Sequence, residues 1–362
     1  MPASKTGVAN LPLHGGKAPK WLFSRMTKLA REICIVIVEE FGPEEMLHKM
    51  SDPYWFQAFG CVLGFDWHSS GLTTTACGAL KEGIRGIEKD LGLFIAGGKG
   101  GASRKTPQQI EDCGDFISVD PATLVYDSKM VAKVDSSALQ DGYHLYHHVF
   151  LFTTNGSWAV VQQGMSEKTR YARRYHWLGE DVNDFVCEPH AAICSEQCGE
   201  TLNLVAAESD SARGVITGIA TENKPEKNIA DLKRLKTLEL PRRHDIVMQD
   251  IHPDRIGKII ASAYDRHPSD FEELLSLPGV GPKTIRALSL LSELIYETPP
   301  SFSDPARFSF AHGGKDGIPY PVDRQTYDQS IELLRKAVLR SKVESGHKRQ
   351  SINRLDGGHF DR

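Results

Sequence analysis

The sequence lacks the features that would place it in a membrane or make it a generally basic nucleic-acid-binding chain. Its most apolar early run, residues 33–38, ends at Glu39 and Glu40 and is far too short to span a bilayer. The formal net charge is −4, so any surface for nucleic acid must be local. Seven cysteines without a signal peptide favour a reducing cytoplasm over a disulfide framework. We therefore expect a cytoplasmic protein without a membrane partner.

What the sequence does contain is a short glycine turn between two helical patterns. The first pattern opens at Asp270, and the second runs from Thr284 to Ile295. Between them stands the run Leu-Pro-Gly-Val-Gly-Pro-Lys-Thr, residues 277–284. A turn this short requires glycine and leaves backbone N–H groups unpaired at the start of the second helix, where a phosphate can bind.

This run resembles the helix-hairpin-helix motif of proteins that grip the DNA backbone without reading bases. A purely structural helical hairpin is the alternative. The resemblance implies that duplex or branched DNA is the partner and that the contacts come from the turn and the first residues of the second helix: Pro278, Gly279, Val280, Gly281, Lys283 and Thr284.

The rest of the chain predicts an α+β fold. Helices are expected at 22–41 and 43–50, and two antiparallel strands at 144–153 and 157–163, joined at Asn155-Gly156, the sharpest hairpin signal in the sequence. The predicted organisation comprises four parts: an α+β catalytic domain at 1–200, linking helices at 201–243, a helical DNA-binding domain at 244–345 and a flexible basic tail at 346–362.

Two further basic segments are candidates for nucleic-acid contacts. The Gly-rich loop 97–107 lacks the spacing of a P-loop, but Lys99 and Arg104 suit phosphate contacts; a solvated surface loop is the alternative. Arg173 and Arg174 stand among aromatic residues, as in a groove for stacked bases, or else mark a sheet edge covered by an Arg-rich helix.

The C-terminal part, from about His252 to Lys342, also resembles the helix-hairpin-helix base-excision DNA glycosylase superfamily. That resemblance implies that Lys283 is the amine nucleophile and that Asp323, in a Val-Asp pair, stabilises charge. The chain departs from this superfamily because the separation of lysine and aspartate is longer. It also has no cysteine after Cys198, so no iron–sulfur cluster is expected. Alternatively, Lys283 only touches phosphate.

Two other groups suggest metal chemistry. Acidic residues and histidines near the first strand resemble those of nucleases that use divalent ions such as Mg²⁺ or Mn²⁺, although the acidic-x-Lys pattern of the second strand is missing and hydrogen-bonded histidines are the alternative. The candidate catalytic residues of this group are Asp135, Asp141, His148 and Gln163. A zinc site is the second possibility, with buried thiols on a helix as the alternative. Its candidate ligands are Cys187, His190, Cys194 and Cys198.

Taken whole, the chain resembles an uncharacterised prokaryotic family in which a domain of unknown function precedes the hairpin. The similarity lies in residues 133–143, 158–165, 173–177 and 319–323. Our leading hypothesis is a DNA-processing or repair enzyme, foremost a nuclease. The alternatives are a glycosylase/lyase and a non-catalytic DNA-binding protein. The polar loops 66–71 and 312–317 receive no assigned reaction.

Overall fold

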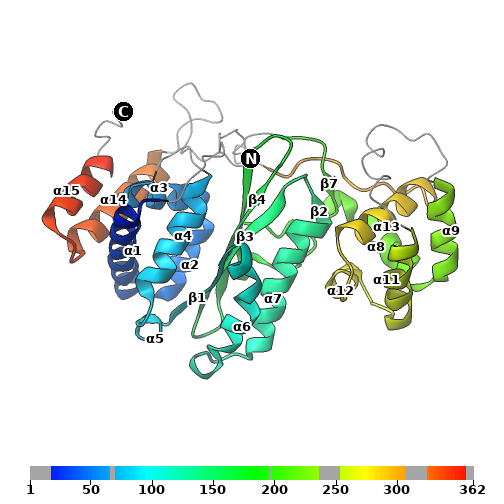
Figure 1. The fold of residues 1–362 in the computed structure, drawn as a ribbon, viewed down its shortest axis with the longest axis horizontal. Coiled ribbons are helices and arrows are strands. Elements are labelled where there is room, and N and C mark those ends of the chain that lie inside the picture. The colour runs from blue at the N-terminus through cyan, green and yellow to red at the C-terminus, as the bar shows by residue number, and fades with distance from the viewer. Residues whose placement is uncertain (1–17, 66–69, 196–197, 236–252, 307–323, 356–362) are drawn as a thin grey trace.

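The fold is α+β, with an antiparallel sheet between two groups of helices (Figure 1). A computed structural model describes residues 18–65, 70–195, 198–235, 253–306 and 324–355. The predicted loops 66–71 and 312–317 lie largely or wholly outside these residues, and Asp323 lies outside them too.

The main sheet has five strands in the order β1-β3-β4-β5-β6, and every neighbouring pair is antiparallel. The predicted strand pair is confirmed, and the Asn155-Gly156 turn joins its two strands, with Gly156 at a φ of 88°. The strands are β1 (Leu93–Lys99), β3 (His144–Thr153), β4 (Trp158–Met165), β5 (Ala172–Leu178) and β6 (Ala192–Cys194).

Both faces of the sheet are covered because side chains on β3 alternate between two cores. Val149 and Leu151 join the core beneath the N-terminal helices, whereas Phe150 and Phe152 join the core that includes α6 and α7. The helices of these two layers are α1 (Lys20–Phe41), α2 (Pro43–Ser51), α3 (Pro53–Leu63), α4 (Gly71–Ile84), α5 (Glu88–Leu91), α6 (Thr106–Glu111) and α7 (Pro121–Lys133).

A second helical group carries the glycine turn and packs against the end of α7 (Figure 1). The predicted pair of helices around the turn is confirmed as α12 and α13. The group comprises α8 (Asp210–Thr221), α9 (Pro225–Leu235), α11 (Pro253–Arg266), α12 (Phe271–Ser276) and α13 (Pro282–Leu294).

The C-terminal helices correct the predicted domain boundaries. α14 (Arg324–Arg340) packs on α1 through Leu334, Ala337 and Val338, on the far side of the sheet from the glycine turn (Figure 1). α15 (Ser345–Leu355) is a helix beside α3 where a flexible tail was predicted. In the predicted linker, α8 and α9 pack on α13 and α11, so they belong to the hairpin group.

A short irregular segment connects the sheet to the hairpin group. α7 continues into a π-helical turn, Val134–Ala138, and then into β2 (Leu139–Gln140), which pairs with β7 (Leu202–Asn203). Isolated π-helical turns are rare and are frequent at functional sites. Both candidate sites described below are attached to this segment.

Candidate functional sites

The turn between α12 and α13 is exposed on the surface, and its backbone has the geometry that glycine permits. Gly279 has a φ of 84°, a region that residues with a Cβ avoid. Pro278, Gly279, Pro282 and Lys283 are exposed, whereas Val280 points into the core and is only 4% exposed. Burial of Val280 contributes about 1.5–3 kcal/mol and holds the turn against the helices beneath it.

Lys133, the last residue of α7, fixes the direction of the turn. Its Nζ donates to the carbonyls of Leu275, Leu277 and Val280, at 2.5, 2.7 and 3.2 Å. In a trans peptide the C=O of one residue and the N–H of the next point in opposite directions. Because the Val280 carbonyl faces Lys133, the Gly281 N–H faces away from it. Within the described part of the chain, the amides of Gly279 and Gly281 donate to no protein acceptor.

Both glutamates of α12 accept hydrogen bonds from residues outside the turn. Glu272 accepts from the Tyr126 hydroxyl at 2.7 Å, and Glu273 accepts from Ser269 at the other end of the helix. Gln140 forms a second hydrogen bond to the start of α13, since its Nε2 donates to the Pro282 carbonyl at 2.9 Å. Burial lowers the pKa of Lys133 to about 8.

The residues of the turn predicted to contact DNA therefore fall into an exposed group and a buried group. Pro278, Gly279, Gly281 and Lys283 can reach a ligand at the surface. Val280 and Thr284 cannot offer their side chains, because Thr284 is 3% exposed and Val280 is part of the core. The prediction that the Thr284 hydroxyl contacts phosphate is corrected on this ground.

Asp135, in the π-helical turn, is the centre of a second, buried site. Its carboxylate is 0% exposed and accepts from three side chains on three different segments. Gln162 Nε2 and Trp177 Nε1 donate to Oδ2, the latter at 2.9 Å, and His190 Nε2 lies 2.5 Å from Oδ1. Three N–H donors occupy most of the acceptor positions of this buried carboxylate, and among the described residues no other His, Cys, Asp or Glu side chains join it in a group of three that could hold a metal ion. The predicted role of Asp135 as a metal ligand is corrected on this ground.

The hydrogen bonds of Asp135 determine which ring nitrogen of His148 carries a proton. Gln162 directs its NH₂ group towards Asp135, where Nε2 donates to Oδ2. Its carbonyl Oε1 then faces His148 Nδ1 at 2.8 Å, so Nδ1 carries the proton. His148 Nε2 is left as an acceptor, and the Ser128 hydroxyl donates to it at 2.9 Å. We call this chain, Ser128–His148–Gln162–Asp135, the serine–histidine relay.

The relay opens into a cavity of about 260 Å³ between the Gly-rich segment, α7 and β3. Ser128, His148 and Gln162 line it, together with the cationic side chains of Arg104 and Lys129. Lys99 lies 5.6 Å from the centre of the Tyr146 ring, which also lines the cavity. Of the two predicted basic residues, the exposed Arg104 lines this cavity, whereas Lys99 does not. Lys99 is paired with His147 on β3, next to Gln163 on β4.

Burial lowers the pKa of His148 below the ordinary value for histidine, against an opposing contribution from the Gln162 hydrogen bond and the Asp135 charge. His148 is therefore neutral at pH 7, as a general base must be. Asp135 and His148 are among the residues predicted from the sequence, whereas Ser128 is not, because no motif in the chain marks it.

Gln163, the other predicted polar residue of β4, does not join the relay. Adjacent residues of a strand point to opposite faces, and Gln163 donates instead to the Ser70 carbonyl at 2.8 Å and to the Tyr146 hydroxyl. The prediction that Gln163 acts beside Asp135 is therefore corrected: Gln162 is the residue in contact.

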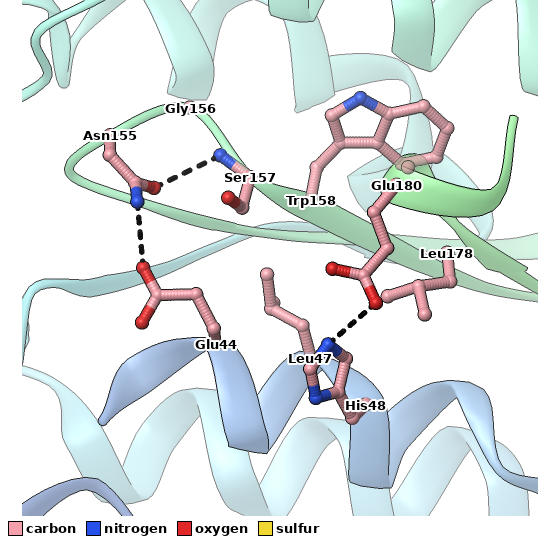
Figure 2. A pocket seen from close by; sticks show the side chains of 10 residues that line it. Glu44, Leu47, His48, Asn155, Gly156, Ser157, Trp158, Leu178 and Glu180 are labelled. Carbon is pink, nitrogen blue, oxygen red and sulfur yellow. Dashed lines mark hydrogen bonds and ion pairs between the residues drawn. The ribbon is translucent and has the colours of Figure 1, made fainter. Parts of the chain in front are cut away.

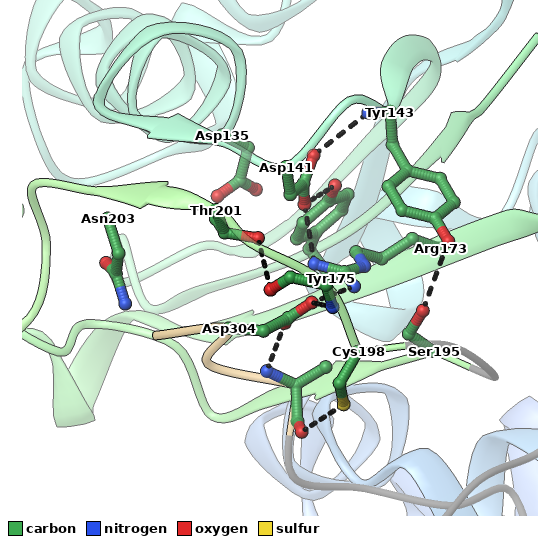
Figure 3. A network of polar contacts seen from close by, with 12 residues as sticks. Asp135, Asp141, Tyr143, Arg173, Tyr175, Ser195, Cys198, Thr201, Asn203 and Asp304 are labelled. Atoms are coloured by element: carbon green, nitrogen blue, oxygen red, sulfur yellow. Dashed lines mark hydrogen bonds and ion pairs between the residues drawn. The ribbon is translucent and has the colours of Figure 1, made fainter. Parts of the chain in front are cut away.

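Arg173 forms a buried ion-pair cluster instead of a nucleic-acid groove (Figure 3). Its guanidinium donates to Asp141 at 2.9 Å and to Asp304 at 2.7 Å, and the Tyr143 ring lies 4.5 Å from its central carbon. The Tyr175 hydroxyl also donates to Asp141 at 2.7 Å. Burial raises the pKa of Asp141, although the Arg173 charge opposes this shift.

This cluster corrects three predictions. Arg173 is 1% exposed, and Asp141 is occupied by Arg173 and Tyr175, so neither is available to DNA or to a metal ion. Arg174, on the opposite face of β5, is 0% exposed and lies 4.5 Å from the Phe56 ring. Burial lowers the pKa of Arg174 to about 10. The segment 172–178 is a central strand, not a helix over a sheet edge.

The four residues predicted to bind zinc do not converge. His190 is bonded to Asp135, while the Cys194 thiol is buried beside Arg174, and burial raises its pKa to about 12. Cys198 Sγ lies 3.6 Å from the Ala306 carbonyl. Among the described residues, no group of three or more His, Cys, Asp or Glu side chains is arranged to hold a metal ion.

Two further cavities lie at the edges of the sheet. One, of about 290 Å³, lies beside the Asn155-Gly156 turn, where Asn155 donates to Glu44 at 2.8 Å and His48 lies 2.9 Å from Glu180 (Figure 2). The first contact joins α2 to the turn between β3 and β4, and the second joins it to the 3₁₀ turn after β5. The other, of about 350 Å³, is lined by His190, Glu188, Glu208 and Asp304.

The lysine and aspartate implied by the glycosylase resemblance cannot be compared in space, because Asp323 lies outside the described residues. Lys283 is exposed on the first turn of α13. In the described parts of the chain, no helix combines the length and the apolar character needed to cross a bilayer.

The fold and its sites define an α+β protein with an exposed glycine hairpin held by a half-buried lysine. Residues 7–322 match the model of a family described as a protein of unknown function, DUF763, and the chain belongs to that family. This agrees with the expected resemblance to an uncharacterised family. Comparisons with curated proteins and with solved structures gave no match. The family description names no activity.

Proposed function

We propose that this protein binds DNA and holds the phosphate backbone of the duplex through the turn at 278–283. The observation that supports this most is the contact of Lys133 with three turn carbonyls, because it directs the Gly281 amide outwards. The amide lies at the start of α13, a 13-residue helix whose dipole favours an anion there. Lys283 adds a positive charge next to it.

The features of the turn suit backbone binding better than the reading of bases. Glycine and proline offer backbone groups and little side-chain surface, so they can approach a phosphate closely but cannot distinguish base edges. The overall charge of −4 makes a broad electrostatic attraction to DNA unavailable. Binding should therefore be local, weakly dependent on sequence and sensitive to salt.

Fluorescence anisotropy with a labelled 20-base-pair duplex tests this proposal. We expect Lys283→Gln to weaken binding and to reduce the slope of log affinity against log salt by about 1, because one phosphate contact is lost. Lys168→Gln is the matched control, since Lys168 is an exposed lysine in the β4–β5 connection. Equal affinity and equal salt slope for both variants would contradict the proposal.

DNA processing is the finer proposal, and the buried Asp135 network supports it because it supplies a histidine prepared for acid–base chemistry. The rival lyase reading predicts a borohydride-stable protein–DNA adduct that disappears in Lys283→Ala. An architectural role predicts salt-dependent binding without any product. Incubation of the protein with intact, abasic and branched duplexes, with and without borohydride, separates these three outcomes.

A further inference from the structure

We propose that the cavity beside α7 is a phosphodiesterase active site in which Ser128 is the nucleophile and His148 is the general base. This proposal deepens the proposed function, on which its choice of a nucleic-acid phosphodiester rests. It is argued from the serine–histidine relay, the cavity into which the relay opens and the cations at the rim.

The relay has the three parts that an activated hydroxyl requires. A nucleophile needs a base within hydrogen-bond reach, and the base needs a third group that orients it. Ser128 Oγ lies 2.9 Å from His148 Nε2, and Gln162 Oε1 lies 2.8 Å from His148 Nδ1. The hydrogen bond from Gln162 Nε2 to Asp135 fixes the amide, so its oxygen faces His148 Nδ1 and selects the tautomer that carries the proton there.

The orienting groups are unusually well held. Asp135 is bonded to Trp177 and His190 as well as to Gln162, so it cannot rotate without losing buried hydrogen bonds. His148 and Gln162 are paired across β3 and β4, which fixes the distance between their backbones. Gln162 and Asp135 act through His148 and are positioning residues.

The cavity identifies the class of substrate. Arg104 and Lys129 line it, whereas none of the described residues that line it is an Asp or a Glu. A neutral carboxylic ester gives no reason for such a basic rim. A phosphodiester carries one negative charge in its ground state and gains charge in the transition state, which these cations can stabilise.

The reaction is balanced with water as the only co-reactant. Ser128 Oγ forms a bond to phosphorus while the bond from phosphorus to the leaving alcohol oxygen breaks, and the serine proton passes through His148 Nε2 to that oxygen. Water then attacks the phosphoserine diester and gives a proton to His148. The bond from phosphorus to Ser128 breaks, the serine oxygen takes the proton back, and a phosphomonoester is released.

The first experiment measures hydrolysis of thymidine 5′-(4-nitrophenyl phosphate), with 4-nitrophenyl acetate as the neutral comparison. We expect the phosphodiester to be hydrolysed in preference to the acetate, and kcat to fall at least 100-fold in Ser128→Ala and His148→Gln. Ser136→Ala is the matched control, because Ser136 is exposed in the π-helical turn and lies outside the relay. Absence of turnover by the wild type, or equal rates for wild type and Ser128→Ala, would overturn the proposal.

The second experiment tests Ser128 without depending on the substrate. A fluorophosphonate probe should label Ser128, as located by peptide mass spectrometry, and the labelling rate should fall at least tenfold in His148→Gln. Asp135→Asn should lower the labelling rate and kcat with KM unchanged, whereas a purely structural role would change only the melting temperature. Labelling of another serine, or labelling independent of His148, would contradict the assignment.

The two proposals fail separately. If the hairpin binds DNA and the relay is catalytic, Ser128→Ala binds the labelled duplex like the wild type while its hydrolysis is lost. Loss of DNA binding in Lys283→Gln with unchanged hydrolysis of the small phosphodiester keeps the cavity assignment. If hydrolysis of the small phosphodiester is lost in Lys283→Gln but retained in Ser128→Ala, the cavity assignment is overturned.

Discussion

Replacement of Lys133 by methionine tests the link between the buried anchor and the exposed turn. The change keeps most of the aliphatic stem and removes the ammonium that three carbonyls accept. A hydrogen bond to a charged group contributes about 1.5–3 kcal/mol, and bonds made by one group are not additive. We therefore expect a loss of about 3 kcal/mol from the docked turn, which corresponds to a factor of roughly 100 in an equilibrium constant.

In the anisotropy assay this loss should weaken duplex binding by between about ten- and a hundredfold, since the Gly281 amide is no longer directed outwards. The pKa of Lys133, lowered by burial to about 8, adds a pH dependence. Above pH 8 the neutral amine has two N–H groups for three carbonyls, so wild-type affinity should fall between pH 7 and pH 9. The Lys133→Met variant should bind DNA weakly at both pH 7 and pH 9.

Lys133→Arg keeps the charge at both pH values and should abolish the step in affinity. Lys168→Met, the change of an exposed lysine, controls for the loss of one positive charge. If Lys133→Met binds DNA as tightly as Lys168→Met while its circular dichroism and melting temperature match the wild type, the argument that Lys133 directs the turn is refuted.

Two further predictions concern stability. Arg173→Met leaves Asp141 and Asp304 buried without their partner and should reduce the free energy of unfolding by about 3–5 kcal/mol, as measured by urea denaturation; a loss below 1 kcal/mol would contradict this. Burial raises the pKa of Asp127 from 3.8 to about 6, so the folded state keeps a proton that the unfolded chain releases between about pH 4 and 6. The stability contributed by this proton is therefore lost as pH rises through 6, and Asp127→Asn should melt at a higher temperature than the wild type at pH 7, with the difference vanishing near pH 4.

The sequence predicted those features that depend on local pattern. The turn at 277–281 was found because its glycines, its proline and the flanking apolar periodicity lie within one short stretch. The strand pair was found because Asn155-Gly156 specifies a hairpin. Both are encoded by neighbours along the chain, so no knowledge of the tertiary fold is needed.

The relay was only half predictable because it depends on strand register and on long-range contacts. Gln162 and Gln163 are adjacent in sequence, and a shift of one residue moves a side chain to the other face of the sheet. Gln163 is the predicted residue, whereas the pairing of His148 with Gln162 brings Gln162 to Asp135. Ser128 reaches His148 only because α7 crosses this face of the sheet.

The Gly-rich segment 97–107 shows what composition alone does not predict. Its composition predicts a loop at 97–107, but Gly97 and Gly98 belong to strand β1. Gly97 has a φ of 89°, and a Cβ there would lie 2.2 Å from the His148 carbonyl oxygen. Glycine is therefore required for close approach of two strands beside the cavity, a requirement that composition alone cannot distinguish from flexibility.

Hydrogen–deuterium exchange of the full-length protein, with and without the 20-base-pair duplex, tests the central proposal most directly. If the turn holds the phosphate backbone, DNA should slow exchange in the peptides that contain Gly279, Gly281 and Lys283, and Lys283→Gln should reduce this protection. Protection confined to other segments, with unchanged exchange across residues 277–284 at saturating DNA, would contradict the account.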